Sequence, residues 1–132
     1  MITYKKRRKY KYTLEEDHSR QTDVKVPENA DLCLVKIDIT GFLQIKKGYA
    51  WDGPSGPTFD TKNFMRGSLV HDALYQLMRE GKIDQNQKLR ADEILREICI
   101  EDGMSKIRAW WVYVGVKWFG AGSTKPDLRK AP

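Results

Sequence analysis

The hydrophobic period of this chain changes once, and the change falls at a segment that can form neither a helix nor a strand. Apolar residues before position 50 tend to alternate with polar ones, whereas after position 61 they recur every three or four positions. The intervening residues 48–57 read GYAWDGPSGP, and their three glycines and two prolines exclude regular structure. Strands first and helices afterwards predict an α+β fold rather than a βαβ one.

The first half predicts a small antiparallel sheet. Period-two alternation predicts strands over 2–14, 32–39 and 42–50, with a shorter strand at 22–26 that Pro27 ends. Residues 15–23 are polar and predict a turn or loop, and residues 27–31 a turn.

The second half predicts three helices packed against this sheet. They are expected over 60–81, 84–103 and 105–120, because each range starts at a capping side chain and ends near a glycine. The third helix carries Trp110, Trp111 and Trp118 on one broad apolar face, which predicts that it is the core element. We expect one domain over residues 1–121 and a loose tail over 122–132.

The net charge of +6 lies entirely in the first fourteen residues, which contain six cations and no acid. Charges in the rest of the chain balance, which excludes a protein that is basic all over, such as a histone-like DNA coat. Tyrosines interleave with the cations, so nucleic acid is a candidate partner, and acidic proteins and lipid head groups fit as well. The simpler interpretation, which we favour, is an exposed edge strand kept soluble by charge. The cations are Lys5, Lys6, Arg7, Arg8, Lys9 and Lys11.

The predicted first helix holds ionisable side chains within an apolar sequence, SLVHDALYQL over residues 68–77. His71 and Tyr75 are four positions apart and therefore neighbours, and Ser68 and Asp72 can also meet. Burying such groups is costly unless they are partnered, so His71 and Asp72 should find partners elsewhere. The candidate partners are Asp52 and Ser55 in the Gly/Pro segment and Asp92 on the second helix.

Three interpretations of this cluster compete. In the structural one, which we favour, Asp52 clamps the loop and His71 forms a buried pair with Asp52 or Asp92. In the catalytic one, a carboxylate orients His71, which acts as a general base on water or on Ser55. In the third, His71 and neighbouring aspartates bind a divalent metal. The chain has only two histidines, too few for the ligand set of the HD metal-dependent phosphohydrolases.

The two cysteines form neither a disulfide framework nor a CxxC metal pair. Cys33 and Cys99 lie far apart among apolar residues, so we favour two buried free thiols in a reducing compartment over a single bridge between them.

Together these motifs resemble a family of small phage and prophage proteins of unknown function. The resemblance covers residues 42–121, and it implies a phage or prophage origin without supplying an activity. It implies that Asp52, Ser55, His71, Asp72, Tyr75 and Asp92 belong to one site. The matching positions are Asp52, Ser55, Pro57, His71, Asp72, Leu74, Tyr75, Asp92, Phe119 and Gly120.

Two functions therefore stay open. One is a small hydrolase, with His71 as base or ligand and Ser55 as nucleophile or substrate contact. The other is a non-enzymatic virion or host-interaction protein that binds through the basic N-terminal strand. No signal peptide or membrane span is expected, which predicts the cytoplasm of the bacterial host or the virion as its location.

Overall fold

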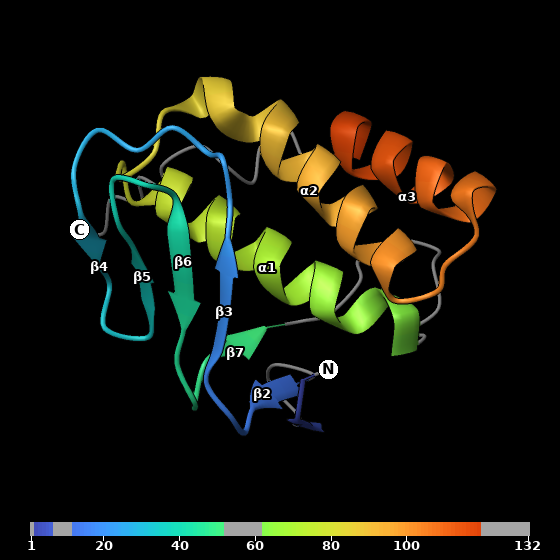
Figure 1. Ribbon diagram of the computed structural model, residues 1–132, viewed down its shortest axis with the longest axis horizontal. Helices are drawn as coiled ribbons and strands as arrows, with labels where there is room; N and C mark the ends of the chain where they lie inside the picture. The colour runs from blue at the N-terminus through green and yellow to red at the C-terminus, as the bar shows by residue number, and fades with distance from the viewer. Residues whose placement is uncertain (1, 7–11, 52–61, 120–132) are drawn as a thin grey trace, which may run out of the picture.

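The described residues of the protein form three α-helices and two small antiparallel sheets in a computed structural model (Figure 1). The structure describes residues 2–6, 12–51 and 62–119. All strands precede all helices in the chain, so the predicted α+β class is confirmed. The predicted single sheet is instead divided into two sheets, of three and four strands.

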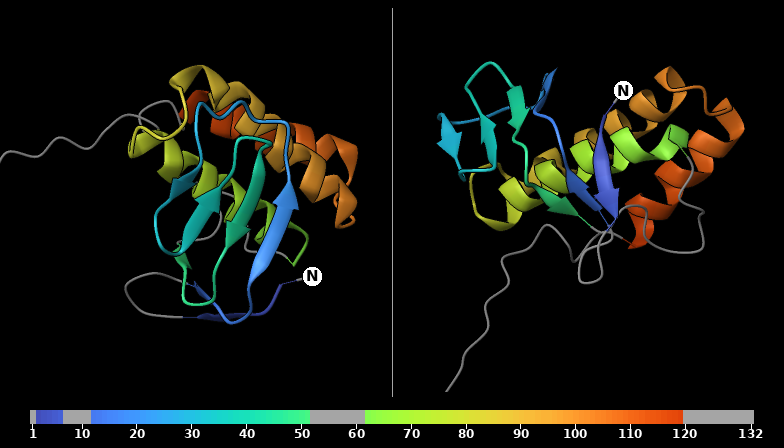
Figure 2. Two further views of the ribbon diagram at one scale, coloured as in Figure 1. Left: turned by 60° about the vertical axis from the view of Figure 1, so that its left-hand side comes forward. Right: turned by 90° about the horizontal axis from the view of Figure 1, so that it is seen from below.

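The four-stranded sheet, sheet B, has the order β3-β6-β5-β4 and covers α1 on the side away from α3 (Figures 1 and 2). Its strands are β3 (His18–Gln21), β4 (Ala30–Asp31), β5 (Val35–Ile37) and β6 (Phe42–Ile45). Alternate side chains of β5 and β6 are buried, so period two places one face of the sheet on the helices.

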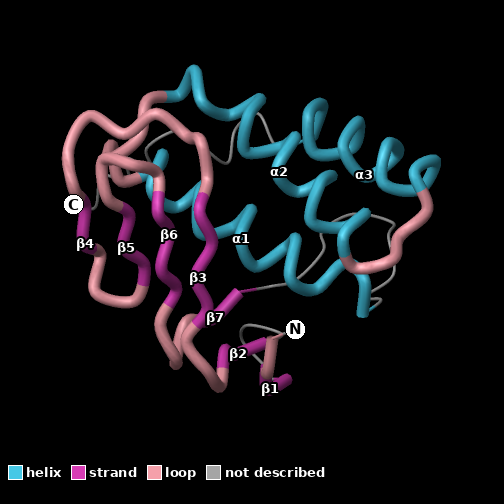
Figure 3. Tube along the Cα trace, viewed as in Figure 1, coloured by secondary structure: helices cyan, strands magenta, loops and turns pink. Residues whose placement is uncertain are grey.

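The three-stranded sheet, sheet A, has the order β1-β2-β7 and runs beside the start of α1 (Figure 3). Its strands are β1 (Tyr4–Lys6), β2 (Tyr12–Leu14) and β7 (Ala50–Trp51). The indole of Trp51 is buried against the ring of Tyr12, with 5.6 Å between ring centroids, and its Nε1 donates to Ser68 Oγ at 3.1 Å. Trp51 therefore fastens sheet A to α1.

Several strand predictions were wrong in detail. The strand expected over 2–14 is two antiparallel strands, with Tyr4 opposite Leu14, because the same alternation continues on both arms of a hairpin. The loop expected over 15–23 contains β3, and the strand expected at 22–26 is irregular. The strands expected over 32–39 and 42–50 are each shorter, and β4 occupies part of the predicted turn.

The central element is α1 (Lys62–Arg79), in which 12 of 18 residues are buried. It contacts the sheets on one side and α2 (Lys88–Glu101) on the other, and α3 (Lys106–Phe119) packs on α2 (Figure 1). Gly67 sets the distance between α1 and α2, because a Cβ atom there would lie 2.8 Å from Leu95 Cδ1.

Capping side chains fixed the helix boundaries close to the predicted positions. The Asp84 carboxylate caps a short 3₁₀ turn, Gln85–Gln87, that leads into α2, and Ser105 Oγ accepts from the Arg108 amide at the start of α3. Gly81 and Gly103 have positive φ of 73° and 98° just past α1 and α2, as C-terminal caps require.

The prediction that the aromatic helix α3 is the core element was wrong. Trp110, Trp111 and Trp118 are 45%, 64% and 72% exposed, and α3 is held on α2 through Ala109 and Val112 instead. The apolar side chains of α3 occupy two faces, and the smaller ones are buried. The prediction for Cys33 was also wrong, since Cys33 is exposed and adopts a left-handed φ of 74° after β4, whereas Cys99 is buried as expected.

Candidate functional site

The polar cluster predicted around His71 centres on the carboxylate of Asp92. His71 Nε2 lies 2.7 Å from Asp92 Oδ1, and the Tyr75 hydroxyl donates to the same oxygen at 2.5 Å. His71 is 6% exposed and Asp92 is fully buried. Their positions follow from the helices, since His71 and Tyr75 are one turn apart on α1 and face α2. We call His71, Tyr75, Lys88 and Asp92 the Asp92 cluster.

Lys88 completes the cluster and extends it to α3. Its Nζ donates to Asp92 Oδ2 at 2.8 Å, one turn along α2, and lies 3.4 Å and 3.3 Å from the carbonyl oxygens of Val116 and Lys117. These carbonyls belong to the last turn of α3, where backbone acceptors lack intrahelical partners and a cation is favourable. Lys88 thus connects the buried carboxylate with the end of the third helix. Lys88 was not among the residues predicted for this site, although its position four residues before Asp92 could have indicated it.

Charges within the cluster stabilise one another. Burial alone would raise the pKa of Asp92, but the hydrogen bonds from His71, Lys88 and Tyr75 outweigh it and the pKa is lowered. Burial alone would likewise lower the pKa of His71, but Asp72 and Asp92 raise it above its ordinary value. Burial and the Asp92 carboxylate raise the pKa of Tyr75. The cluster thus favours an imidazolium beside a carboxylate, and a neutral phenol.

The remaining residues of the predicted site either lie at the edge of the Asp92 cluster or fall outside the described residues. Asp72 Oδ1 is 3.9 Å from His71 Nδ1, beyond hydrogen-bond distance, and the Asp72 side chain is 35% exposed. Ser68 does not pair with Asp72, because its hydroxyl donates to the Met65 carbonyl and accepts from Trp51. Asp52 and Ser55 lie outside the described residues, as do Pro57 and Gly120.

The predicted basic surface is described only in part. β1, which contains Lys5 and Lys6, is an edge strand of sheet A, while residues 7–11 lie outside the described residues. Tyr12, one of the interleaved tyrosines, is 5% exposed and packs against Trp51, so it cannot stack on an external ligand.

The metal interpretation finds no ligand set within residues 2–6, 12–51 and 62–119. No three His, Cys, Asp or Glu side chains in these ranges are arranged to hold a metal ion. At the Asp92 cluster itself, Lys88 and Tyr75 donate to the two carboxylate oxygens.

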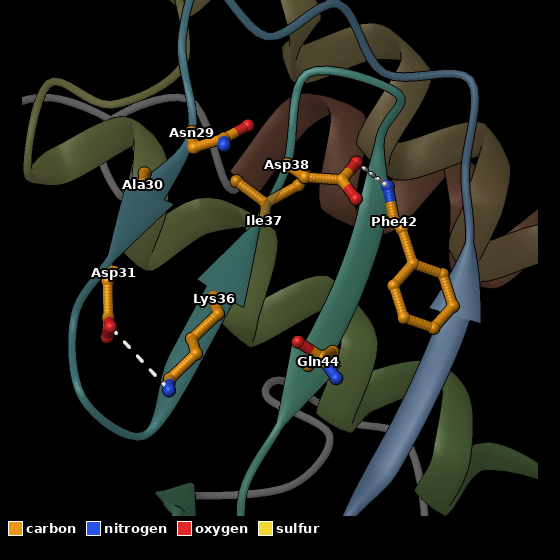
Figure 4. Close-up of a pocket in the computed structure, with 8 residues that line it drawn as sticks. All are labelled: Asn29, Ala30, Asp31, Lys36, Ile37, Asp38, Phe42 and Gln44. Carbon is orange, nitrogen blue, oxygen red and sulfur yellow. Dashed lines mark hydrogen bonds and ion pairs between the residues drawn. The ribbon is translucent and has the colours of Figure 1, made fainter.

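A shallow hollow lies away from the Asp92 cluster, on sheet B (Figure 4). Its polar groups maintain the local turns: Asp38 Oδ1 accepts from the Phe42 and Thr40 amides, and Asn29 Oδ1 accepts from the Ile39 amide. Lys36 pairs with Asp31 at 3.6 Å. Because these side chains already bond to the protein, the hollow does not present a converging set of groups to a ligand. It is lined by Asn29, Ala30, Asp31, Lys36, Ile37, Asp38, Phe42 and Gln44.

An ion-pair network that the sequence did not predict joins sheet B to the helices. The guanidinium of Arg20 on β3 donates to both oxygens of Glu101, at 3.0 and 2.7 Å, and Arg66 on α1 donates to Glu101 and Asp102. These arginines offset two acids at the C-terminal end of α2, where negative charge is unfavourable. Arg20 and Glu101 are 81 positions apart, and no local pattern in the sequence links them.

Comparison with known proteins identifies the family but not an activity. Residues 29–116 match the family described as "Protein of unknown function (DUF1353)", so the chain belongs to this family. The matched range contains His71, Tyr75, Lys88 and Asp92 and ends within α3. No curated protein and no solved structure matches the chain. Among the described residues, no helix combines the length and apolar character needed to cross a membrane.

Proposed function

We propose that this protein is a non-enzymatic binding protein whose Asp92 cluster is structural and whose basic N-terminal segment contacts an anionic partner. The observation that carries the proposal is the saturation of Asp92, whose two oxygens accept from His71, Tyr75 and Lys88. A buried carboxylate with three donors has its bonding requirements met within the protein.

The raised pKa of His71 supports the same conclusion. A general base must be neutral at the working pH, whereas carboxylates beside both ring nitrogens raise the pKa of His71. Tyr75 is a poor acid for the same reason, because the adjacent carboxylate raises its pKa. The charges of His71 and Lys88 are balanced by Asp72 and Asp92, as in a closed ion-pair network.

The basic segment supports the binding role through its charge and its place in the sheet. It carries the whole excess charge of the chain, and β1 lies at an edge where a partner can approach. A phage or prophage origin, implied by the family resemblance, remains part of the proposal and would make the partner a component of the virion or the host.

The competing function is a small hydrolase, and one observation favours it. His71 lies between Asp92 and the partly exposed Asp72, and α1 follows directly on the segment with Asp52 and Ser55. In such an enzyme Asp92 would orient His71, and the far side of the imidazole would act on water or on Ser55. This alternative requires His71 to lose its proton near neutral pH.

Charge reversal tests the binding proposal. The triple variant Lys5→Glu, Arg7→Glu, Lys9→Glu should lose binding to whichever of single-stranded DNA and RNA the wild type binds. The matched control reverses Lys25, Lys47 and Lys82, which are exposed and lie elsewhere, and it should bind as the wild type does. Equal binding by both variants, or no binding to any probe by the wild type, would overturn the proposal. The hydrolase alternative would be established if the wild type hydrolysed a generic ester or phosphoester substrate and His71→Gln abolished this activity.

A further inference from the structure

Helix α3 presents an apolar stripe that is exposed and that the other described elements do not cover. Ile107, Trp111 and Trp118 are 76%, 64% and 72% exposed, and Trp110 is 45% exposed. Trp110 and Trp111 follow Ile107 by three and four positions, and Trp118 follows Trp111 by seven. This spacing places the four side chains on one side of the helix, together with the half-buried Val114. Exposed large apolar groups that form one continuous patch mark interaction sites more often than scattered ones do.

The opposite side of α3 is already occupied. Ala109 and Val112 are buried against Leu95 and Cys99 of α2, and Val116 packs against the same group. Lys88 also binds the carbonyls of the last turn. The helix is therefore fixed with its tryptophan stripe outward, and the stripe is not a surface that α2 could bury by a small shift.

Cations flank the stripe on both edges. At about 100° per residue, Lys106 and Lys117 fall on one edge of the stripe and Arg108 falls on the other. The helix contains no acid, and the acids that precede it, Glu101 and Asp102, are bound by Arg66. A partner that covers this face must therefore combine an apolar layer with negative charge at its margin.

We propose that the tryptophan face of α3 docks in the interface of an anionic lipid bilayer, with the helix parallel to the membrane plane. Tryptophan is favoured at the boundary between head groups and acyl chains, and lysine and arginine beside it attract anionic lipids. A second copy of this chain fits less well, since pairing two α3 faces would bring cations against cations with no acid on either helix. The proposal is independent of the basic N-terminal segment, which lies on another element.

Intrinsic fluorescence provides a direct test, because three of the four tryptophans lie on this face and Trp51 is buried at 2% exposure. Adding vesicles of phosphatidylglycerol and phosphatidylcholine to the full chain should shift the emission to the blue. Lipids brominated near the head-group end of the acyl chains should quench the tryptophan emission. The affinity for vesicles of phosphatidylcholine alone should be lower by about tenfold or more.

Two variants assign the effect to α3. Trp111→Ser with Trp118→Ser should lower vesicle affinity about tenfold or more while leaving the fold intact, because these side chains are mostly exposed. The double variant Lys106→Glu, Lys117→Glu should lower the affinity for anionic vesicles. Reversing Lys5, Arg7 and Lys9 should leave the blue shift and the quenching in place, which separates this proposal from the proposed function.

Three results would overturn the proposal. The first is an unchanged emission spectrum with anionic vesicles. The second is vesicle binding that survives both α3 variants, which would assign it to another surface. The third is a blue shift that grows with protein concentration in the absence of lipid and coincides with dimerisation in sedimentation, which would show that a second copy covers the face.

Discussion

His71 Nε2 and Asp92 Oδ1 lie 2.7 Å apart across the interface of α1 and α2, with 7% of the His71 side chain and none of the Asp92 side chain exposed. The pair joins the two helices at the centre of the molecule. Removing one member of such a pair leaves a buried charge or hydrogen-bonding group without its partner, which is costly. The stability of the helical half should therefore depend on these two residues.

Lys88→Met should destabilise the protein and loosen the end of α3. The substitution removes one donor from the buried Asp92 carboxylate and the cation beside the Val116 and Lys117 carbonyls. We expect a loss of about 2 kcal/mol in the free energy of unfolding, measured by urea titration. Amide hydrogen exchange in the last turn of α3 should also become faster. Lys82→Met, at an exposed position, is the matched control, and equal effects of the two changes would contradict the role given to Lys88.

The contribution of His71 to stability should be lost at alkaline pH. Its folded pKa is raised above 6.5, so the stability that it adds is fully present below about pH 6.5 and declines as the pH rises through the folded pKa. The difference in unfolding free energy between wild type and His71→Gln should therefore shrink from pH 6 to pH 9. A difference that grows over this range would mean that burial, rather than the two carboxylates, determines the pKa.

Two glycines in helices should respond oppositely to alanine. A Cβ at Gly67 would lie 2.8 Å from Leu95 Cδ1 and 3.0 Å from Cys99 Sγ, whereas nothing lies within 4 Å of one at Gly115. Gly67→Ala should lower the unfolding free energy by about 1–3 kcal/mol through overpacking. Gly115→Ala should raise it by about 0.5–1 kcal/mol through helix propensity. Melting temperatures of the two variants check both signs, and stabilisation by Gly67→Ala would contradict the close α1–α2 packing.

The two thiols should differ in reactivity. Cys33 is exposed, whereas Cys99 is fully buried, and burial raises the pKa of its thiol to about 12. An aromatic disulfide reagent at pH 8 should label one thiol rapidly in the native protein and the second only after denaturation. Cys33→Ser should remove the rapid phase, and rapid labelling of both thiols in the wild type would contradict the packing of α2 on α3.

The helices and part of the site could be predicted from the sequence, because interactions between residues close together in the chain determine them. Asp84, Ser105 and the glycines after α1 and α2 act within a few residues of their own positions. The convergence of His71 and Asp92 was also predictable, because ionisable groups on apolar helix faces require partners. The sequence did not show which of the candidate carboxylates would be the partner of His71, because that choice depends on how α2 packs along α1.

The predictions for α3 and for residues 2–14 were wrong because the hydrophobic pattern of each segment is compatible with two arrangements. A helix with two apolar faces, such as α3, does not show which face its neighbour covers, and the small side chains of Ala109 and Val112 allow the closer approach. Alternation likewise continues through a hairpin, so residues 2–14 resembled one strand. The pairing of Arg20 with Glu101 depends on the tertiary fold alone.

A double-mutant cycle of unfolding free energies tests whether His71 and Asp92 form a structural pair. His71→Gln, Asp92→Asn and the double variant keep the side chains similar in size. We expect each single change to cost about 2–4 kcal/mol and the cycle to give a coupling energy of about 1–3 kcal/mol. Additive effects, or a His71→Gln variant as stable as the wild type, would contradict the claim.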